Sequence, residues 1–201
     1  MRLQNLIPDF EAHFKKLKDL YFEMSSGYQA VADQYEFSCR DCPDNCCRTR
    51  FYNHTYIEYF YLMEGLAGLS GKEQETLVQK ARGVCEEIAA TNGRGEAPRV
   101  MCPVNEEGLC TLYEYRPMIC RLHGIPYDLQ FPGRDSVRGE ACTEFTNRAL
   151  SDQYIPYDRT PLYKTLSQLE GELRSVTGKT SKIKMTIAEM IAYDPDDPLK
   201  Q

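Results

Sequence analysis

The chain has 201 residues, of which 42% are hydrophobic and 27% are charged. These values are ordinary for a globular protein, and the length fits one domain, residues 1–201, with a sizeable core. The net charge of −6 argues against general nucleic-acid binding, which needs a basic surface. No run of about 18 apolar residues occurs, so the sequence predicts no membrane-spanning helix.

Residues 1–9 contain neither an apolar segment nor a small-residue cleavage site, so we expect a cytoplasmic protein. Thiols stay reduced in that compartment, where groups of cysteines are typical of metal binding or redox chemistry. The odd total of nine Cys also fits a disulfide framework poorly.

Residues 8–34 carry apolar side chains at three- and four-residue steps, which predicts a long amphipathic helix. Its stripe consists of Phe10, Phe14, Leu17, Leu20, Tyr21, Met24, Tyr28 and Val31. Gly27 weakens the prediction for the last turns. We expect this helix to pack on the core rather than to bind a partner.

Four thiols then fall within a short stretch, at Cys39, Cys42, Cys46 and Cys47. The Asp, Pro and Asn residues between them favour a tight turn over a helix or strand. Packing gives no reason for such crowding in a mainly helical protein. Because a C-x2-C pair can bring two sulfurs onto one ion from a single turn, this segment predicts one half of a metal site.

Two further helices are predicted from Thr-x-x-Glu at residues 55–58 and Ser-x-x-Glu at residues 70–73, both of which are capping boxes. The first helix should end near Gly65 to Gly68 and the second near Thr91. Cys85 lies in the apolar stripe of the second. Free Cys is among the most buried residue types, so we expect Cys85 in the core and not at a metal.

Downstream, Cys102 and Cys110 flank a predicted tight connection between two short extended segments. Pro117 has the backbone angle of a first helical turn, which places Cys120 in the first turn of a short helix. The positive end of the helix dipole favours a thiolate at that position.

Residues 124–139 are predicted to form a loop, and Cys142 begins the next short helix. The region 160–193 then holds one helix that ends at Gly178 and a last, capped helix that begins at Thr186. We therefore expect a mainly α fold with little or short β structure. In it, helices 8–34 and 160–193 clamp the loop-rich cysteine region.

Eight thiols are candidate metal ligands, because structural zinc and iron–sulfur clusters each take four Cys. They are Cys39, Cys42, Cys46, Cys47, Cys102, Cys110, Cys120 and Cys142. Adjacent side chains of an extended backbone point to opposite sides, so Cys46 and Cys47 rarely meet one ion. Either two four-Cys sites divide this pair between them, or one site exists and the spare thiols support it, react or stay free.

Four thiolates around zinc leave a net charge of −2, which needs compensation. The arginines that flank candidate ligands could provide it: Arg40, Arg48, Arg50, Arg116 and Arg121. His123 follows Cys120 by three residues and would share its helix face if the helix extended that far. Because Gly124 comes next, His123 stays a candidate ligand or a residue lining the site.

These residues resemble the bacterial cysteine-cluster proteins described as a zinc- or iron-chelating domain and named for a CxxCxxCC motif. The matching runs are Cys39-x2-Cys42-x3-Cys46-Cys47, with one extra residue before the pair, and Cys110-Thr-Leu-Tyr-x-Tyr-Arg-Pro-x2-Cys120-Arg. The resemblance covers about residues 36–145. It implies that all eight candidate Cys are associated with metal.

The same group includes a flagellin lysine N-methylase, which uses S-adenosylmethionine and looks like an iron–sulfur protein. The resemblance therefore implies protein lysine methylation as an alternative, although no Gly-rich nucleotide loop supports it independently. The residues themselves assign no catalytic group and identify no protein partner. The sequence predicts a protein that holds zinc or iron, with a [4Fe–4S] cluster as one form. A thiol redox or metal-handling role for Cys46 and Cys47 is a third possibility.

Overall fold

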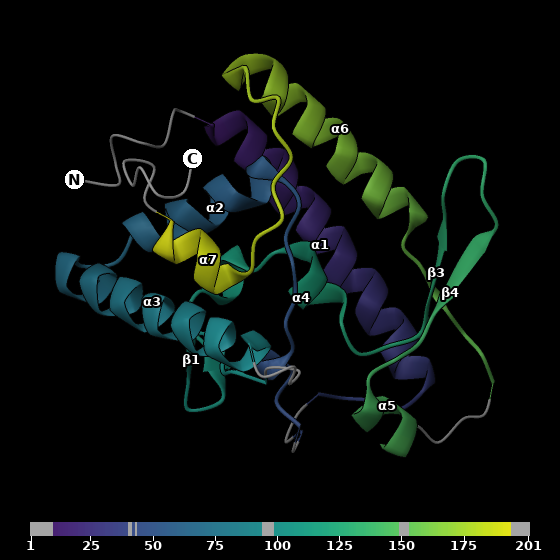
Figure 1. The fold of residues 1–201 in the computed structure, drawn as a ribbon. Coiled ribbons are helices and arrows are strands. Elements are labelled where there is room, and N and C mark those ends of the chain that lie inside the picture. The colour runs from purple at the N-terminus through teal and green to yellow at the C-terminus, as the bar shows by residue number, and fades with distance from the viewer. Residues whose placement is uncertain (1–9, 40–41, 43, 94–98, 149–152, 194–201) are drawn as a thin grey trace. The chain divides into compact units, whose positions relative to one another are not determined.

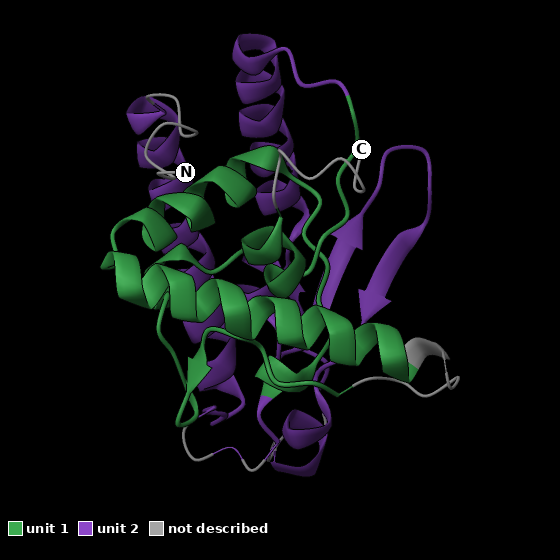
Figure 2. Ribbon diagram, turned by 60° about the vertical axis from the view of Figure 1, so that its left-hand side comes forward, with its two compact units in different colours: residues 1–8, 46–117, 181–201 green, residues 9–45, 118–180 purple. Residues whose placement is uncertain are grey.

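A computed structural model describes residues 10–39, 42, 44–93, 99–148 and 153–193 (Figure 1). Of these residues 58% are helical and 9% lie in strands or bridges, so the predicted mainly α class is confirmed. The chain divides into two compact units (Figure 2). Unit 1 combines Met1–Pro8, Cys46–Pro117 and Ser181–Gln201, and unit 2 combines Asp9–Asn45 and Met118–Thr180.

Unit 1 is built on three helices and a small hairpin. Its elements are η2 (Cys46–Arg48), α2 (Tyr56–Ala67), α3 (Gly71–Gly93), β1 (Asn105–Glu106), β2 (Leu109–Cys110), η3 (Tyr113–Tyr115) and α7 (Ile187–Ala192). Helix α3 packs against α7, and α2 packs against η3. Their shared core includes Leu66, Ala81, Val104 and Met190, all of which are buried. The predicted connection between Cys102 and Cys110 is the antiparallel β1–β2 hairpin.

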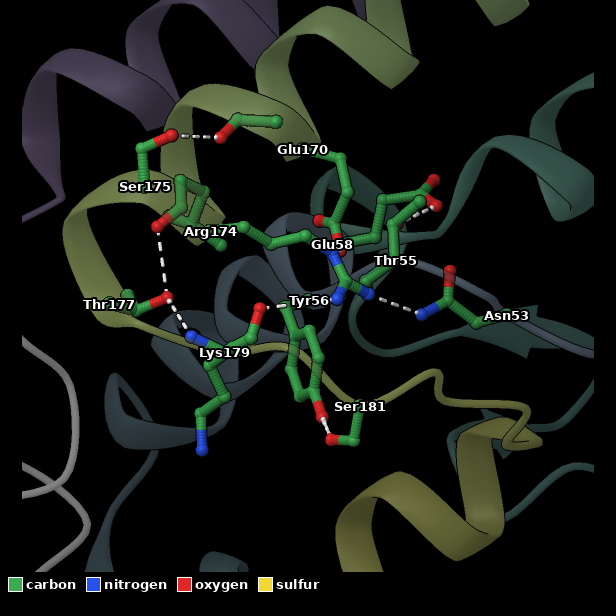
Figure 3. A network of polar contacts seen from close by, with 12 residues as sticks. Asn53, Thr55, Tyr56, Glu58, Glu170, Arg174, Ser175, Thr177, Lys179 and Ser181 are labelled. Carbon is green, nitrogen blue, oxygen red and sulfur yellow. Dashed lines mark hydrogen bonds and ion pairs between the residues drawn. The ribbon is translucent and has the colours of Figure 1, made fainter.

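The predicted helix starts in unit 1 are confirmed, although one cap differs in detail. Helix α2 begins after Thr55, whose hydroxyl donates to the Glu58 carboxylate (2.6 Å) and does not accept a backbone N–H as a cap would (Figure 3). Both bonds of a capping box form at Ser70 before α3 and at Thr186 before α7. These bonds satisfy backbone N–H groups that a helix start leaves without partners.

Unit 2 is built on two long helices, α1 (Glu11–Gln34) and α6 (Thr160–Thr177), which pack against each other. The other elements are α4 (Met118–Leu122), β3 (Tyr127–Gln130), β4 (Ser136–Gly139), α5 (Thr143–Arg148) and β5 (Tyr157–Asp158). Helix α1 continues through Gly27, and a glycine is required there because the Tyr157 ring occupies the space where a Cβ would lie. Pro8 of the predicted first helix lies outside the described residues.

The C-terminal end of α6 is closed as its sequence predicts. Gly178 adopts the left-handed conformation (φ 68°), and its N–H bonds to the carbonyl of Arg174. The Arg174 guanidinium also bonds to the Glu170 carboxylate (2.6 Å) and to the carbonyl of Lys179 (3.2 Å), as Figure 3 shows. A cation at this end of a helix interacts favourably with its dipole.

One predicted loop is wrong. Residues 124–139 contain the β3–β4 hairpin, which β5 extends into a three-stranded sheet in the order β4-β3-β5. Three of the four β4 residues are exposed, so β4 does not present one buried apolar face. The pairing of β3 with β5 is parallel and long-range, and a local pattern cannot predict it. Every helix in the described part of the chain is too short or too polar to cross a bilayer.

Candidate functional site

The eight candidate ligands divide equally between the two units. We call Cys46, Cys47, Cys102 and Cys110 the unit 1 thiols, and Cys39, Cys42, Cys120 and Cys142 the unit 2 thiols. All nine cysteines belong to the described residues, and no disulfide joins any two of them. Cys85 packs against the apolar core of unit 1, as expected, although it is only half-buried.

Backbone hydrogen bonds bring three segments with unit 1 thiols together. The N–H of Cys102 donates to the carbonyl of Cys47 (3.0 Å), which holds two distant stretches of chain side by side. The carbonyl of Cys102 accepts the N–H of Asn105 (3.0 Å), and Asn105 lies opposite Cys110 in the hairpin. Burial, together with the charges of Cys47 and Cys110, raises the pKa of Cys102 to about 12. These three sulfurs therefore lie within electrostatic range of one another.

Cys46 and Cys47 lie in a 3-10 turn and not in extended backbone. Adjacent side chains diverge less in such a turn than in extended backbone, and the Cys46 thiol donates a hydrogen bond to the Cys47 sulfur. This bond, the Asn105 amide and the positive charge of Arg116 lower the pKa of Cys47 to about 6, although burial opposes them. Cys47 is thus a thiolate at neutral pH, which is the form that binds metals.

Three of the unit 2 thiols, Cys39, Cys42 and Cys142, also approach one another, around the end of α1 and the start of α5. The Tyr28 hydroxyl lies 3.6 Å from the Cys39 sulfur, and the Cys42 thiol donates to the carbonyl of Asp44 (3.2 Å). Burial and the charges of Cys39 and Cys42 raise the pKa of Cys142, although a hydrogen bond from the N–H of Phe145 (3.4 Å) opposes them.

Cys120 lies within α4, but His123 does not share its helix face, because α4 ends at Leu122. Gly124 follows with a φ of 128° and accepts the N–H of Cys142 at its carbonyl (3.0 Å). This bond ties Cys142 to the chain just beyond the helix that carries Cys120. Burial, and then the charge of Arg159, lowers the pKa of His123, whereas Asp44 opposes them. A neutral imidazole at physiological pH keeps His123 a candidate ligand.

Sequence reasoning missed Arg159, which is 3% exposed in unit 2. Its guanidinium donates to the carbonyl of Leu122 and stacks on the Tyr127 ring, with the guanidinium carbon 3.7 Å from the ring centroid. Its charge lowers the pKa of Tyr28, although burial and Cys39 raise that pKa more. No candidate ligand flanks Arg159 in sequence, so nothing in the sequence distinguishes it from a surface arginine.

Of the arginines expected to compensate thiolate charge, the structure places Arg116 within range of a thiol. Its charge acts on Cys47 while its guanidinium stacks on the Tyr113 ring (3.6 Å). Arg50 and Arg121 lie over the rings of Tyr52 and Tyr21, at 5.1 and 3.9 Å. Arg48 ends the 3-10 turn of the Cys pair. Arg40 lies outside the described residues, together with Asp41 and Pro43.

Across the described residues, no three His, Cys, Asp or Glu side chains are arranged as a metal site. The thiols of each unit thus lie near one another without forming a coordination shell. The number and type of donors nevertheless fit, because zinc and iron–sulfur clusters take four soft thiolate ligands and each unit contains four such thiols.

Comparisons with protein-family models, with curated proteins and with solved structures give no match for this chain. Its function is therefore inferred from the side chains and their surroundings.

Proposed function

We propose that the protein binds zinc or iron, the latter including a [4Fe–4S] cluster, through its clustered cysteine thiolates. One observation carries the proposal: in each unit, thiols from segments far apart in sequence lie within electrostatic range of one another. Burial of several thiols is unfavourable if they ionise without a cation. A soft metal ion supplies that positive charge and favours the thiolate form.

The surrounding groups are consistent with a site that carries net negative charge. Arg116 acts on Cys47 in unit 1, and in unit 2 Arg159 acts on Tyr28, which itself contacts Cys39. Such cations offset the charge that four thiolates leave on a divalent ion. A structural zinc site contributes about 10–16 kcal/mol of apparent binding energy, enough to stabilise a region that has little apolar core of its own.

The test is metal content in matched variants of the full chain. Cys39→Ser and Cys120→Ser should each lose metal and unfold at lower denaturant concentration, because each removes one proposed ligand. The control is Cys85→Ala, which should keep its metal and lose only the stability associated with a small cavity. Equal metal loss from Cys85→Ala would refute the ligand assignment.

A thiol redox role is the second candidate, and the low pKa of Cys47 beside the Cys46 thiol favours it. This role predicts a metal-free protein in which Cys47 reacts first with an electrophile. Anaerobic metal analysis combined with alkylation separates the two proposals. Metal binding predicts a metal-loaded protein in which Cys47 is protected from alkylation, whereas the redox role predicts a metal-free protein in which Cys47 reacts.

A further inference from the structure

We infer that the eight thiols form two separate four-thiol metal sites, one in each unit, and that Cys46 and Cys47 belong to the same site. The inference rests on the proposed metal binding and adds the ligand set of each site. The unit 1 thiols form one set, and the unit 2 thiols form the other.

Backbone geometry within unit 1 supports the first set. The bond from Cys102 to Cys47 and the pairing of Asn105 with Cys110 fix three thiol-bearing segments in one neighbourhood. The 3-10 turn adds Cys46 to that group, since its thiol bonds to Cys47. Adjacent side chains diverge by about 120° on such a turn, less than in extended backbone, and the Cys46 thiol reaches the Cys47 sulfur.

A buried polar atom also indicates that the unit 1 set carries negative charge when complete. The amide nitrogen Nδ2 of Asn105 is buried, and the Cys47 sulfur is the acceptor within its reach. The amide favours the thiolate form of Cys47. A buried donor needs an acceptor, and a Cys47 thiolate held by a bound metal would supply one.

The second set is supported within unit 2 by a backbone bond from the N–H of Cys42 to the carbonyl of Cys39 (3.4 Å) and by the charges of Cys39 and Cys42, which act on Cys142. The N–H of Cys142 bonds to the carbonyl of Gly124, two residues beyond the helix α4 that carries Cys120. Arg159 supplies a buried cation, whose Nε has no acceptor in the described part of the chain.

The test is a Zn²⁺ titration of the reduced full-length chain under anaerobic conditions. After each addition, a pulse of N-ethylmaleimide labels exposed thiols, and peptide mapping by mass spectrometry reports which cysteines are protected. Protection should saturate at about two equivalents, because each four-thiol set holds one ion. Below saturation, the four thiols of one unit should become protected from N-ethylmaleimide together. Cys85 should label equally at every zinc concentration and is the internal control.

Two single variants test the same division of the thiols by removing one proposed ligand from each set. Cys102→Ser should lose one equivalent and keep unit 2 protection, and Cys142→Ser should show the reverse. Saturation at one equivalent, or a protected set drawn from both units, would overturn the division while leaving metal binding intact. No protection of any thiol by zinc, together with no iron in the anaerobically purified protein, would overturn the proposed function itself. If a variant fails to fold, the wild-type labelling pattern still decides between these outcomes.

Discussion

Cys47 and Cys102 are joined by a backbone hydrogen bond, yet their thiols ionise at very different pH. Three neighbouring groups stabilise the Cys47 thiolate, whereas burial and nearby negative charge favour the neutral Cys102 thiol. A divalent ion at the unit 1 thiols would therefore meet one thiolate already formed and would have to displace a proton from Cys102. Metal affinity should fall as the pH is lowered.

In metal-free protein, Cys47 should alkylate with a pH midpoint near 6, and Cys102 should stay unreactive up to pH 9. Because folding lowers the pKa of Cys47, the resulting stabilisation is complete above the ordinary thiol pKa and is lost as the pH falls through about 6. Pulsed iodoacetamide labelling with peptide mapping measures both midpoints. Cys46→Ala should raise the Cys47 midpoint most, and Arg116→Gln should raise it less. An ordinary midpoint for Cys47 in the wild type would contradict this account.

Arg159→Gln should lower the free energy of unfolding by about 2 kcal/mol, because it removes a stacked cation and a buried hydrogen bond to the Leu122 carbonyl. Arg138→Gln is the matched control in unit 2. Arg138 also lies over a tyrosine ring, that of Tyr154 (4.9 Å), but it is exposed. Its loss should cost less than about 0.5 kcal/mol. Equal effects in urea unfolding would show that burial of Arg159 contributes nothing.

At the scale of elements, the helices were predictable because their start and stop residues act locally. Thr55, Ser70 and Thr186 each precede a helix, and Gly178 ends one. The β3–β4 hairpin was not predictable in this way, since its outer strand is mostly exposed and its partner β5 comes from a distant segment. Long-range pairing depends on tertiary packing, which overrides weak local preference.

Two mid-helix glycines of unit 1 should respond oppositely to the same substitution. A Cβ at Gly65 in α2 would collide with the Tyr115 ring, so Gly65→Ala should destabilise the protein by about 1–3 kcal/mol. At Gly83 in α3 no other group lies within 4 Å, so Gly83→Ala should stabilise it by about 0.5–1 kcal/mol. Urea denaturation compares the two. Stabilisation by Gly65→Ala would show that the α2–η3 packing is wrong.

At the scale of the whole molecule, the sequence predicts the candidate metal ligands more readily than it predicts which of them belong to the same site. Eight candidate ligands could be named from their spacing, but their equal division between two units depends on which segments fold together. The same is true of Tyr28, which lies beside Cys39, and of Arg159, which acts on Tyr28, because only the fold brings these residues together. When a charged or polar residue is far from every cysteine in sequence, the sequence alone does not predict that it lies near the thiols.

The metal content of the anaerobically purified full-length protein tests the central claim most directly. Elemental analysis should give about two zinc ions per chain, or iron together with absorbance near 400 nm that is typical of a Cys-ligated cluster. Less than about one equivalent of zinc or iron, with disulfides detected by mass spectrometry, would contradict the proposal that these cysteines bind metal.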